Sequence, residues 1–260
     1  MRLLGWMALQ ARGLTRPSPR PLEKLIHDGR TLIKRTRALL WFARPALDPE
    51  AFAQARDQLR QAAGLLAAQR DLAATRSVLQ KLKQKVSGSV GRLALADLRQ
   101  MLVLDSATAR VPEKSLRRTL RNSMGLLPGV MDEIEQSATE RTGWTPPRRR
   151  LAKALSDAHA AARQARREGT DVAFHNWRKK AKRLLYLLEL TRKRRCGRGP
   201  GTLKRVHALQ ALLGDYHDCV VVEEQLHRMS VPPPGTPAIQ RLLEKQKTRL
   251  AKKARSLGRP

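Results

Sequence analysis

The stretch HDGRTLIKRTRALLWF at residues 27–42 decides the fold, because its pattern returns as HNWRKKAKRLLYLLEL at residues 175–190. Both copies begin with His and carry Arg three, Lys seven and Arg eight positions later. A second landmark follows each copy: Leu65, Leu66 and Asp71 after the first, and Leu212, Leu213 and Asp218 after the second. Two landmarks of different chemistry that recur at nearly the same spacing indicate a duplicated structural unit.

Apolar side chains recur every three or four positions around both copies, which is the spacing of one helix face. One such face contains Leu25, Ile26, Leu32, Ile33, Leu39 and Leu40, and another contains Phe174, Trp177, Ala181, Leu184, Leu187 and Leu188. No useful length alternates with period two, so no sheet is expected. Short segments rich in Gly and Pro interrupt these patterns, one of them at residues 143–147.

The sequence therefore predicts an all-α protein of roughly eight to ten helices, built from a duplicated helical unit. We expect a weakly ordered N-terminal extension at residues 1–19, a first half at 20–143 and a second half at 144–260. Within them, helices are expected over residues 22–42 and 238–257.

Positive charge dominates the composition, with 53 Lys and Arg against 22 Asp and Glu and a formal net charge of +31. Such a surface attracts polyanions, namely nucleic acid, polyphosphate or an anionic membrane. No apolar run reaches the roughly 18–20 residues that span a bilayer, so a membrane partner is not expected. Only Cys196 and Cys219 are present, which excludes a disulfide framework and fits a reducing, cytoplasmic location.

The charge is organised into a row on each copy of the repeated helix. His27, Arg30, Lys34 and Arg37 fall within an arc of roughly 80° on a helical wheel. His175, Arg178 and Lys182 repeat this row, with Lys179 beside it and Arg183 off to one side. A helix built only for stability would interleave acids four positions away, so these rows indicate an anionic ligand. Arg, Lys and His together supply the donors that phosphate prefers.

No catalytic or metal-binding constellation stands out. We find no Gly-rich phosphate loop, no HExxH and no nucleophile elbow, so we expect neither an enzyme nor a cofactor. Asp71 and Asp218 are expected to orient a basic side chain or to cap their own helices. His207, His217 and Cys219 are too scattered for a zinc site, which leaves them as surface or core residues. The C-terminal helix adds a basic stripe of Arg241, Lys245, Arg249 and Lys252.

The motif His-x-x-Arg-x-x-x-Lys-Arg at 27–35 and 175–183, followed by LLGDYHD at 212–218, resembles the CHAD (conserved histidine α-helical domain) family. The resemblance covers residues 20–257. It implies two pseudo-symmetric halves, each like a four-helix bundle, that form a basic central channel or groove and bind inorganic polyphosphate there. It also implies association with polyphosphate granules. The binding residues implied are His27, Arg30, Lys34, Arg35, Arg37, His175, Arg178, Lys179, Lys182 and Arg183, with Arg241, Lys245 and Arg249 as additional basic lining. Leu185 stands where the family pattern expects Arg, as in Arg37 of the first copy.

Two ligand classes fit this pattern, and polyphosphate is the first. Nucleic acid is the alternative, but proteins that bind it usually add base contacts or aromatic stacking platforms. Aromatic residues make up only 3% of this chain. The sequence leaves the oligomeric state, the preferred polyphosphate length and the physiological role of binding open.

Overall fold

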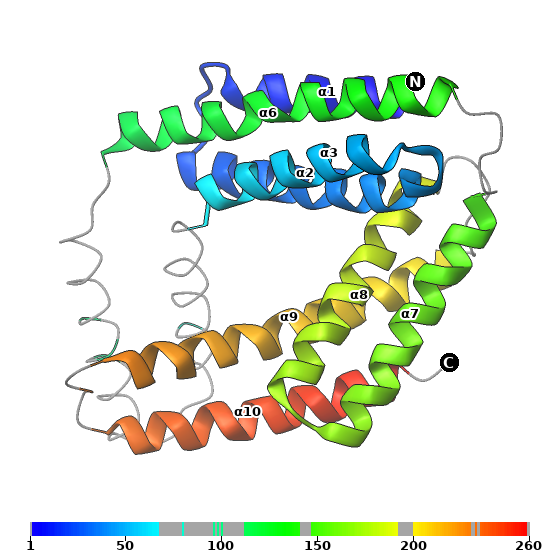
Figure 1. Ribbon diagram of the computed structural model, residues 1–260. Coiled ribbons are helices and arrows are strands. Elements are labelled where there is room, and N and C mark those ends of the chain that lie inside the picture. The colour runs from blue at the N-terminus through cyan, green and yellow to red at the C-terminus, as the bar shows by residue number, and fades with distance from the viewer. Residues whose placement is uncertain are drawn as a thin grey trace. The chain divides into compact units, whose positions relative to one another are not determined.

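The computed structural model describes residues 2–67, 112–140, 147–191, 200–229 and 235–258, with the isolated positions 80, 96, 98, 100 and 232. In chain order these residues form α1 (Arg2–Thr15), α2 (Leu22–Ala43), the 3₁₀ helix η1 (Arg44–Ala46), α3 (Pro49–Leu65), α6 (Glu113–Glu140), α7 (Pro147–Glu168), α8 (Asp171–Thr191), α9 (Pro200–Arg228) and α10 (Thr236–Leu257) (Figure 1). None of the described residues lies in a β-strand, which confirms the all-α class. None of the described helices is both long enough and apolar enough to cross a bilayer.

Local sequence sets the ends of these helices. Pro49 occupies the first turn of α3, and the Asp48 side chain accepts hydrogen bonds from the backbone N–H groups of Glu50 at 2.8 Å and Ala51 at 3.4 Å. This is the usual N-cap, which satisfies donors that the helix itself leaves unpaired. Gly235 precedes α10 with a φ of 84°, a left-handed conformation that glycine adopts without steric cost.

The described residues fall into two compact units. The first lies within Met1–Gln69, Val111–Ala152 and Leu190–Cys196. Here α6 contacts α1, α2 and α3, and one apolar core joins them, with Ile33, Leu59, Met124 and Leu127 almost fully buried. Gly29 allows the close approach of α2 to α6, because a Cβ at this position would lie 3.0 Å from Leu120 Cδ1.

The start of the chain differs from the weakly ordered extension predicted for residues 1–19. Residues Arg2–Thr15 form helix α1, and Met7, Ala11 and Leu14 are buried in the first unit's core. These three residues are four and three positions apart, so they lie on one face of the helix. Burial of that face against α6 explains why the segment is helical.

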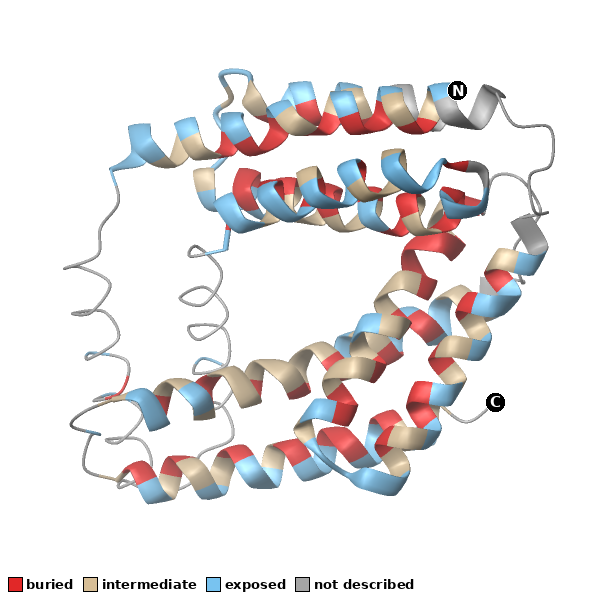
Figure 2. Cartoon of the chain, in the orientation of Figure 1, coloured by how far each residue is buried: buried red, intermediate tan, exposed pale blue. Residues whose placement is uncertain are grey.

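The second unit lies within Arg70–Arg110, Lys153–Glu189 and Gly197–Pro260. Its core contains Phe174 and Trp177 of α8, Tyr216 of α9 and Leu243 of α10. Phe174 and Tyr216 stack with ring centroids 4.5 Å apart. In Figure 2 the buried residues of α10 follow one side of the helix and the exposed residues follow the other.

These units differ from the continuous halves 20–143 and 144–260. Leu98, from the predicted first half, is buried in the core of the second unit. Conversely, the start of α7 belongs to the first unit, where the Arg150 guanidinium lies 3.9 Å from the centroid of the Trp41 ring and donates to the Trp41 carbonyl oxygen. Pseudo-symmetry between the units stays a prediction.

A close contact at the end of α10 gives a stability prediction for the second unit. A Cβ added at Gly258 would overlap the six-membered ring of the buried Trp177 and would lie 3.1 Å from the Ala254 carbonyl oxygen. Because a fully buried indole cannot move aside freely, Gly258→Ala is expected to lower the free energy of unfolding by about 1–3 kcal/mol. Denaturant unfolding followed by circular dichroism measures this loss.

Gly214→Ala is the matched control within the same unit, since an added Cβ there meets nothing within 4 Å. Gly214 lies inside α9, and Ala is the better helix former by up to about 1 kcal/mol. We therefore expect this variant to be neutral or stabilised. Equal destabilisation of both variants would contradict the steric explanation.

Candidate polyanion-binding site

The first predicted row lies on α2, away from its apolar face. Leu25, Ile26, Leu32, Ile33 and Leu40 are buried, and Leu39 packs against the same core, as the periodicity predicted. On the polar side, His27 and Arg37 are exposed, and Arg30, Lys34 and Arg35 are half-buried. His27 lies in the second turn of the helix. Helix α2 thus carries its cations at the edge of the core and in solvent.

Arg30 also has a structural role. Its Nη1 donates a hydrogen bond of 2.7 Å to the carbonyl oxygen of Leu66, the C-cap residue of α3. The last carbonyl groups of a helix lack partners within the helix and form the negative end of its dipole, where a cation is favoured. Arg30 therefore fastens the end of α3 to α2, and its replacement would change more than ligand binding.

The carboxylate inside the first motif is already paired. Asp28 follows His27 directly and accepts a charge-assisted hydrogen bond from the Arg20 guanidinium. Both side chains are more than a third exposed, so this pair adds little stability. It does, however, draw the Asp28 charge toward Arg20.

The second predicted row lies on α8 in the same relation to its apolar face. Phe174, Trp177, Ala181, Leu184, Leu187 and Leu188 are all buried, as predicted. His175 lies in the second turn of α8, as His27 does in α2. His175, Arg178, Lys182 and Arg183 are half-buried and Lys179 is exposed. The two rows thus occupy equivalent positions on two long helices, one in each unit.

Leu185 shows where the two copies differ. It is only 5% exposed, whereas Arg37 at the corresponding position of α2 is exposed. A buried position favours Leu over a cation because an isolated buried charge is costly. The second row is therefore shorter than the first by one cation.

Sequence reasoning missed His217, which we expected to be a surface or core residue without a role. Its ring lies 4.8 Å from that of His175, centroid to centroid, and joins α9 to the second row. Asp218 is next to His217 and half-buried, and Asp215 lies within the same turn of α9. The turn of α9 that carries His217 thus also carries two carboxylates. Asp71, the counterpart of Asp218, is outside the described residues.

Most cations of the two rows have interaction partners within the protein. Lys34, Arg35, Arg178, Lys182 and Arg183 each take part in at least one interaction, as do Asp215 and Asp218. An incoming polyanion would have to replace or extend these interactions.

Comparison with known families decides the identity of the fold. The sequence pattern of the CHAD domain matches residues 12–227, which include α2, α8 and nearly all of α9. The chain belongs to the CHAD domain family. The resemblance seen in its two motifs is thereby confirmed.

Proteins similar to this CHAD domain are found in a plant and in a bacterium. The crystal structure of the CHAD domain from the plant Ricinus communis matches with a TM-score of 0.63 over 98% of this chain and 86% of that chain, at 18% identity. Two uncharacterized proteins of Mycobacterium tuberculosis, from strains CDC 1551 and H37Rv, are 27% identical over 221 residues, covering 79% of this chain and 40% of each relative. The chain thus spans about two fifths of the length of these curated relatives.

Lys247 is a second residue that sequence reasoning missed in this CHAD domain. Its Nζ lies 2.8 Å from Glu223, 3.3 Å from Asp171 and 3.3 Å from Glu244, and its side chain is 10% exposed. Tyr216 donates to the other oxygen of Asp171 at 2.5 Å. Lys247 lies one turn after Leu243 and one turn before Leu250, both buried. A lysine in such an apolar row is a signal of a buried ion pair.

The neighbouring charges change the acid–base behaviour of this cluster. Burial lowers the pKa of Lys247, but the hydrogen bonds and charges of Glu223, Asp171 and Glu244 together outweigh it, so the net pKa is raised. Burial raises the pKa of Glu223, and Lys247 offsets part of that effect. Burial and the hydrogen bond to Asp171 raise the pKa of Tyr216. Burial raises the pKa of the Cys219 thiol to about 12, so Cys219 is not a thiolate nucleophile at neutral pH.

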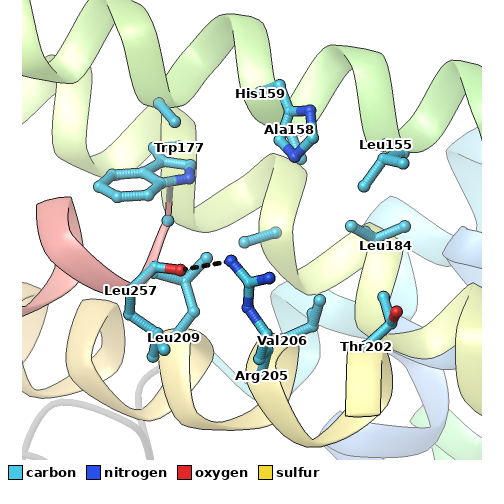
Figure 3. Close-up of a pocket in the computed structure, with 13 residues that line it drawn as sticks. Leu155, Ala158, His159, Trp177, Leu184, Thr202, Arg205, Val206, Leu209 and Leu257 are labelled. Atoms are coloured by element: carbon cyan, nitrogen blue, oxygen red, sulfur yellow. Dashed lines mark hydrogen bonds between the residues drawn. The ribbon is translucent and has the colours of Figure 1, made fainter. Parts of the chain in front are cut away.

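A pocket of about 110 Å³ lies in the second unit, but its chemistry differs from that of the two rows. Figure 3 shows Trp177 and Leu257 at one side and Leu155 and Leu184 at the other. The lining is mainly alkyl and aromatic, with His159, Thr202 and Arg205 as its polar side chains, and Arg205 donates to the Leu257 carbonyl oxygen at 3.3 Å. It contains no residue of either row. In the described residues, no group of three His, Cys, Asp or Glu side chains is arranged to hold a metal ion.

Proposed function

We propose that this CHAD domain binds inorganic polyphosphate through the cationic rows of α2 and α8. The observation that carries the proposal is the repetition of one donor set, His, Arg and Lys, in the second to fourth turns of two helices. Arg offers a planar fork, Lys a point charge and His an N–H donor, and all three bind phosphate oxygens. A net charge of +31 supplies the long-range attraction.

The ligand is expected to be a phosphate polymer and not a nucleic acid. The ring identified beside the second row is another imidazole, His217, whose ring nitrogen can donate a hydrogen bond to phosphate. The aromatic residues of α8, Phe174, Trp177 and Tyr186, are buried and cannot stack on bases. Contacts to phosphate alone suit a chain that consists only of phosphate.

A titration with competitors tests this proposal. The full chain is titrated with labelled polyphosphate at moderate salt, and unlabelled duplex DNA or single-stranded RNA is then added in excess, matched by phosphate concentration. We expect poor displacement by either nucleic acid and efficient displacement by unlabelled polyphosphate. Easy displacement by nucleic acid would favour the alternative ligand, and absence of polyphosphate binding would remove the proposal.

The same sample tests our further expectation that the protein does not hydrolyse its ligand. Incubation of the pure chain with polyphosphate and a divalent metal ion is expected to release no inorganic phosphate above the protein-free control. Phosphate release that survives repeated purification would instead show an enzyme acting on phosphate anhydrides.

A further inference from the structure

Helix α10 carries a second cationic surface, which we call the α10 stripe and define as Arg241, Lys245, Arg249 and Lys252. All four side chains are exposed. The buried residues of the helix are Thr236, Ile239, Leu243, Lys247, Leu250, Ala251 and Ala254. At 100° per residue the stripe lies on the side opposite this buried face. It spans twelve residues, so that eleven rises of about 1.5 Å give a length of about 17 Å along the helix axis.

The charge of the α10 stripe is not neutralised by its own helix. Glu244 is the single acidic residue of α10, and its carboxylate lies 3.3 Å from the ammonium group of Lys247. Within the described part of the chain, no salt bridge involves any member of the stripe. Four cations at helical spacing repel one another. A polyanion that binds along the stripe would relieve this repulsion.

The α10 stripe is separate from the row on α8. Phe174 and Trp177 of α8 and Leu243 and Leu250 of α10 belong to the same core. The stripe faces away from that core, and His175 lies on α8 next to Phe174. The body of α10 therefore lies between the stripe and the core that α8 and α10 share.

The chemistry of the α10 stripe selects among polyanions. An anionic membrane usually holds a helix by an exposed apolar face as well as by charge, but the apolar residues Ile239, Leu243 and Leu250 are buried in the core. Nucleic acid is usually held by stacking or base contacts as well, and α10 contains no aromatic residue. Pure charge contacts along a line fit a linear phosphate polymer best.

We propose that the α10 stripe binds a second polyphosphate chain, so that one protein molecule joins two chains. This inference rests on the proposed function of the α2 and α8 rows. Two separate sites on one protein molecule can crosslink two long polyphosphate chains. Where both sites bind the same chain, the second binding event benefits from a high effective concentration of phosphate.

Binding stoichiometry tests the inference. The stripe variant is Arg241→Gln, Lys245→Gln, Arg249→Gln and Lys252→Gln, and the charge-matched control is Arg12→Gln, Arg16→Gln, Arg163→Gln and Arg167→Gln, all exposed positions outside both rows. Calorimetric titration with polyphosphate no longer than the stripe is expected to give one fewer bound chain for the stripe variant than for the wild type and the control. Equal stoichiometry for all three proteins would overturn the inference and leave the proposed function intact.

A bridging assay tests the same inference directly. Immobilised short polyphosphate captures the protein, which is then offered a second, fluorescently labelled short polyphosphate. Wild type and control are expected to retain the label and the stripe variant to lose it, while all three remain on the first chain. Failure of the wild type to bind the immobilised chain would count against the proposed function itself. If the stripe variant bridges normally but loses binding to duplex DNA or to vesicles of anionic lipid, the stripe serves that other partner.

Discussion

Replacement of Lys34, Arg37, Lys179 and Lys182 by glutamine is expected to weaken polyphosphate binding on the order of a hundredfold at moderate salt. A charge-assisted contact contributes about 1.5–3 kcal/mol, so even partial loss of four contacts exceeds the roughly 2.7 kcal/mol that a hundredfold change requires. Glutamine keeps most of the side-chain length and removes the charge. Arg30 is left in place because it holds the end of α3.

The measurement isolates these contacts from the α10 stripe. Both this variant and its control, Arg12→Gln, Arg16→Gln, Arg163→Gln and Arg167→Gln, are built in the chain that already lacks the stripe charges. Affinity is measured over a range of salt concentrations, and the plot of log affinity against log salt is expected to become shallower in the variant alone. Equal losses in variant and control would show that only overall charge matters, and the assignment to α2 and α8 would fail.

Local sequence predicted the helix on which the first row lies. We expected it at residues 22–42, and α2 is Leu22–Ala43. Pro21 precedes it and Pro45 follows shortly after, and neither can continue a helix interior. The apolar residues at intervals of three and four fixed which face is buried, and hence which face carries His27 and Arg37. These are local properties, so the sequence alone reveals them.

Tertiary contacts decided what the sequence could not. Met7, Ala11 and Leu14 form too short an apolar row to identify a stable helix alone, and α1 is helical because α6 covers that row. Leu98 joins the core of the second unit although it comes from the predicted first half. His217 meets His175 across two helices, and no spacing along the chain encodes that contact.

Replacement of Lys247 by methionine is expected to lower the free energy of unfolding of the second unit by about 3 kcal/mol at neutral pH. Methionine has a similar volume but leaves the Glu223 carboxylate, whose side chain is only 16% exposed, without its cation. Asp171 and Glu244 lie beside the same ammonium group. Removal of one partner of a buried pair costs more than the pair contributes, because a charge stays desolvated. Denaturant unfolding measures the loss, and Lys245→Met, exposed and two residues away, is expected to stay within about 0.5 kcal/mol of wild type.

The pH dependence separates this electrostatic cause from simple loss of packing. In the wild type, folding raises the pKa values of Lys247 and Tyr216. Their contribution to the stability of the folded state is therefore complete below their ordinary pKa values, 10.5 for Lys247 and 10.0 for Tyr216, and it falls as the pH rises above them. In Lys247→Met, the pKa of Glu223 is expected to rise further. The variant's deficit should therefore shrink as pH falls toward 4.5, the ordinary pKa of that carboxyl group.

Two further measurements decide whether the lost charge pair is responsible. Addition of Glu223→Gln to Lys247→Met removes the stranded charge and is expected to recover part of the lost stability. In a Cys196→Ser background, alkylation of the buried Cys219 thiol reports opening of the second unit, and its rate should rise in Lys247→Met but not in Lys245→Met. A deficit that is independent of pH and unchanged by Glu223→Gln would assign the effect to packing, and the buried charge cluster would then not be what holds α9 and α10 together.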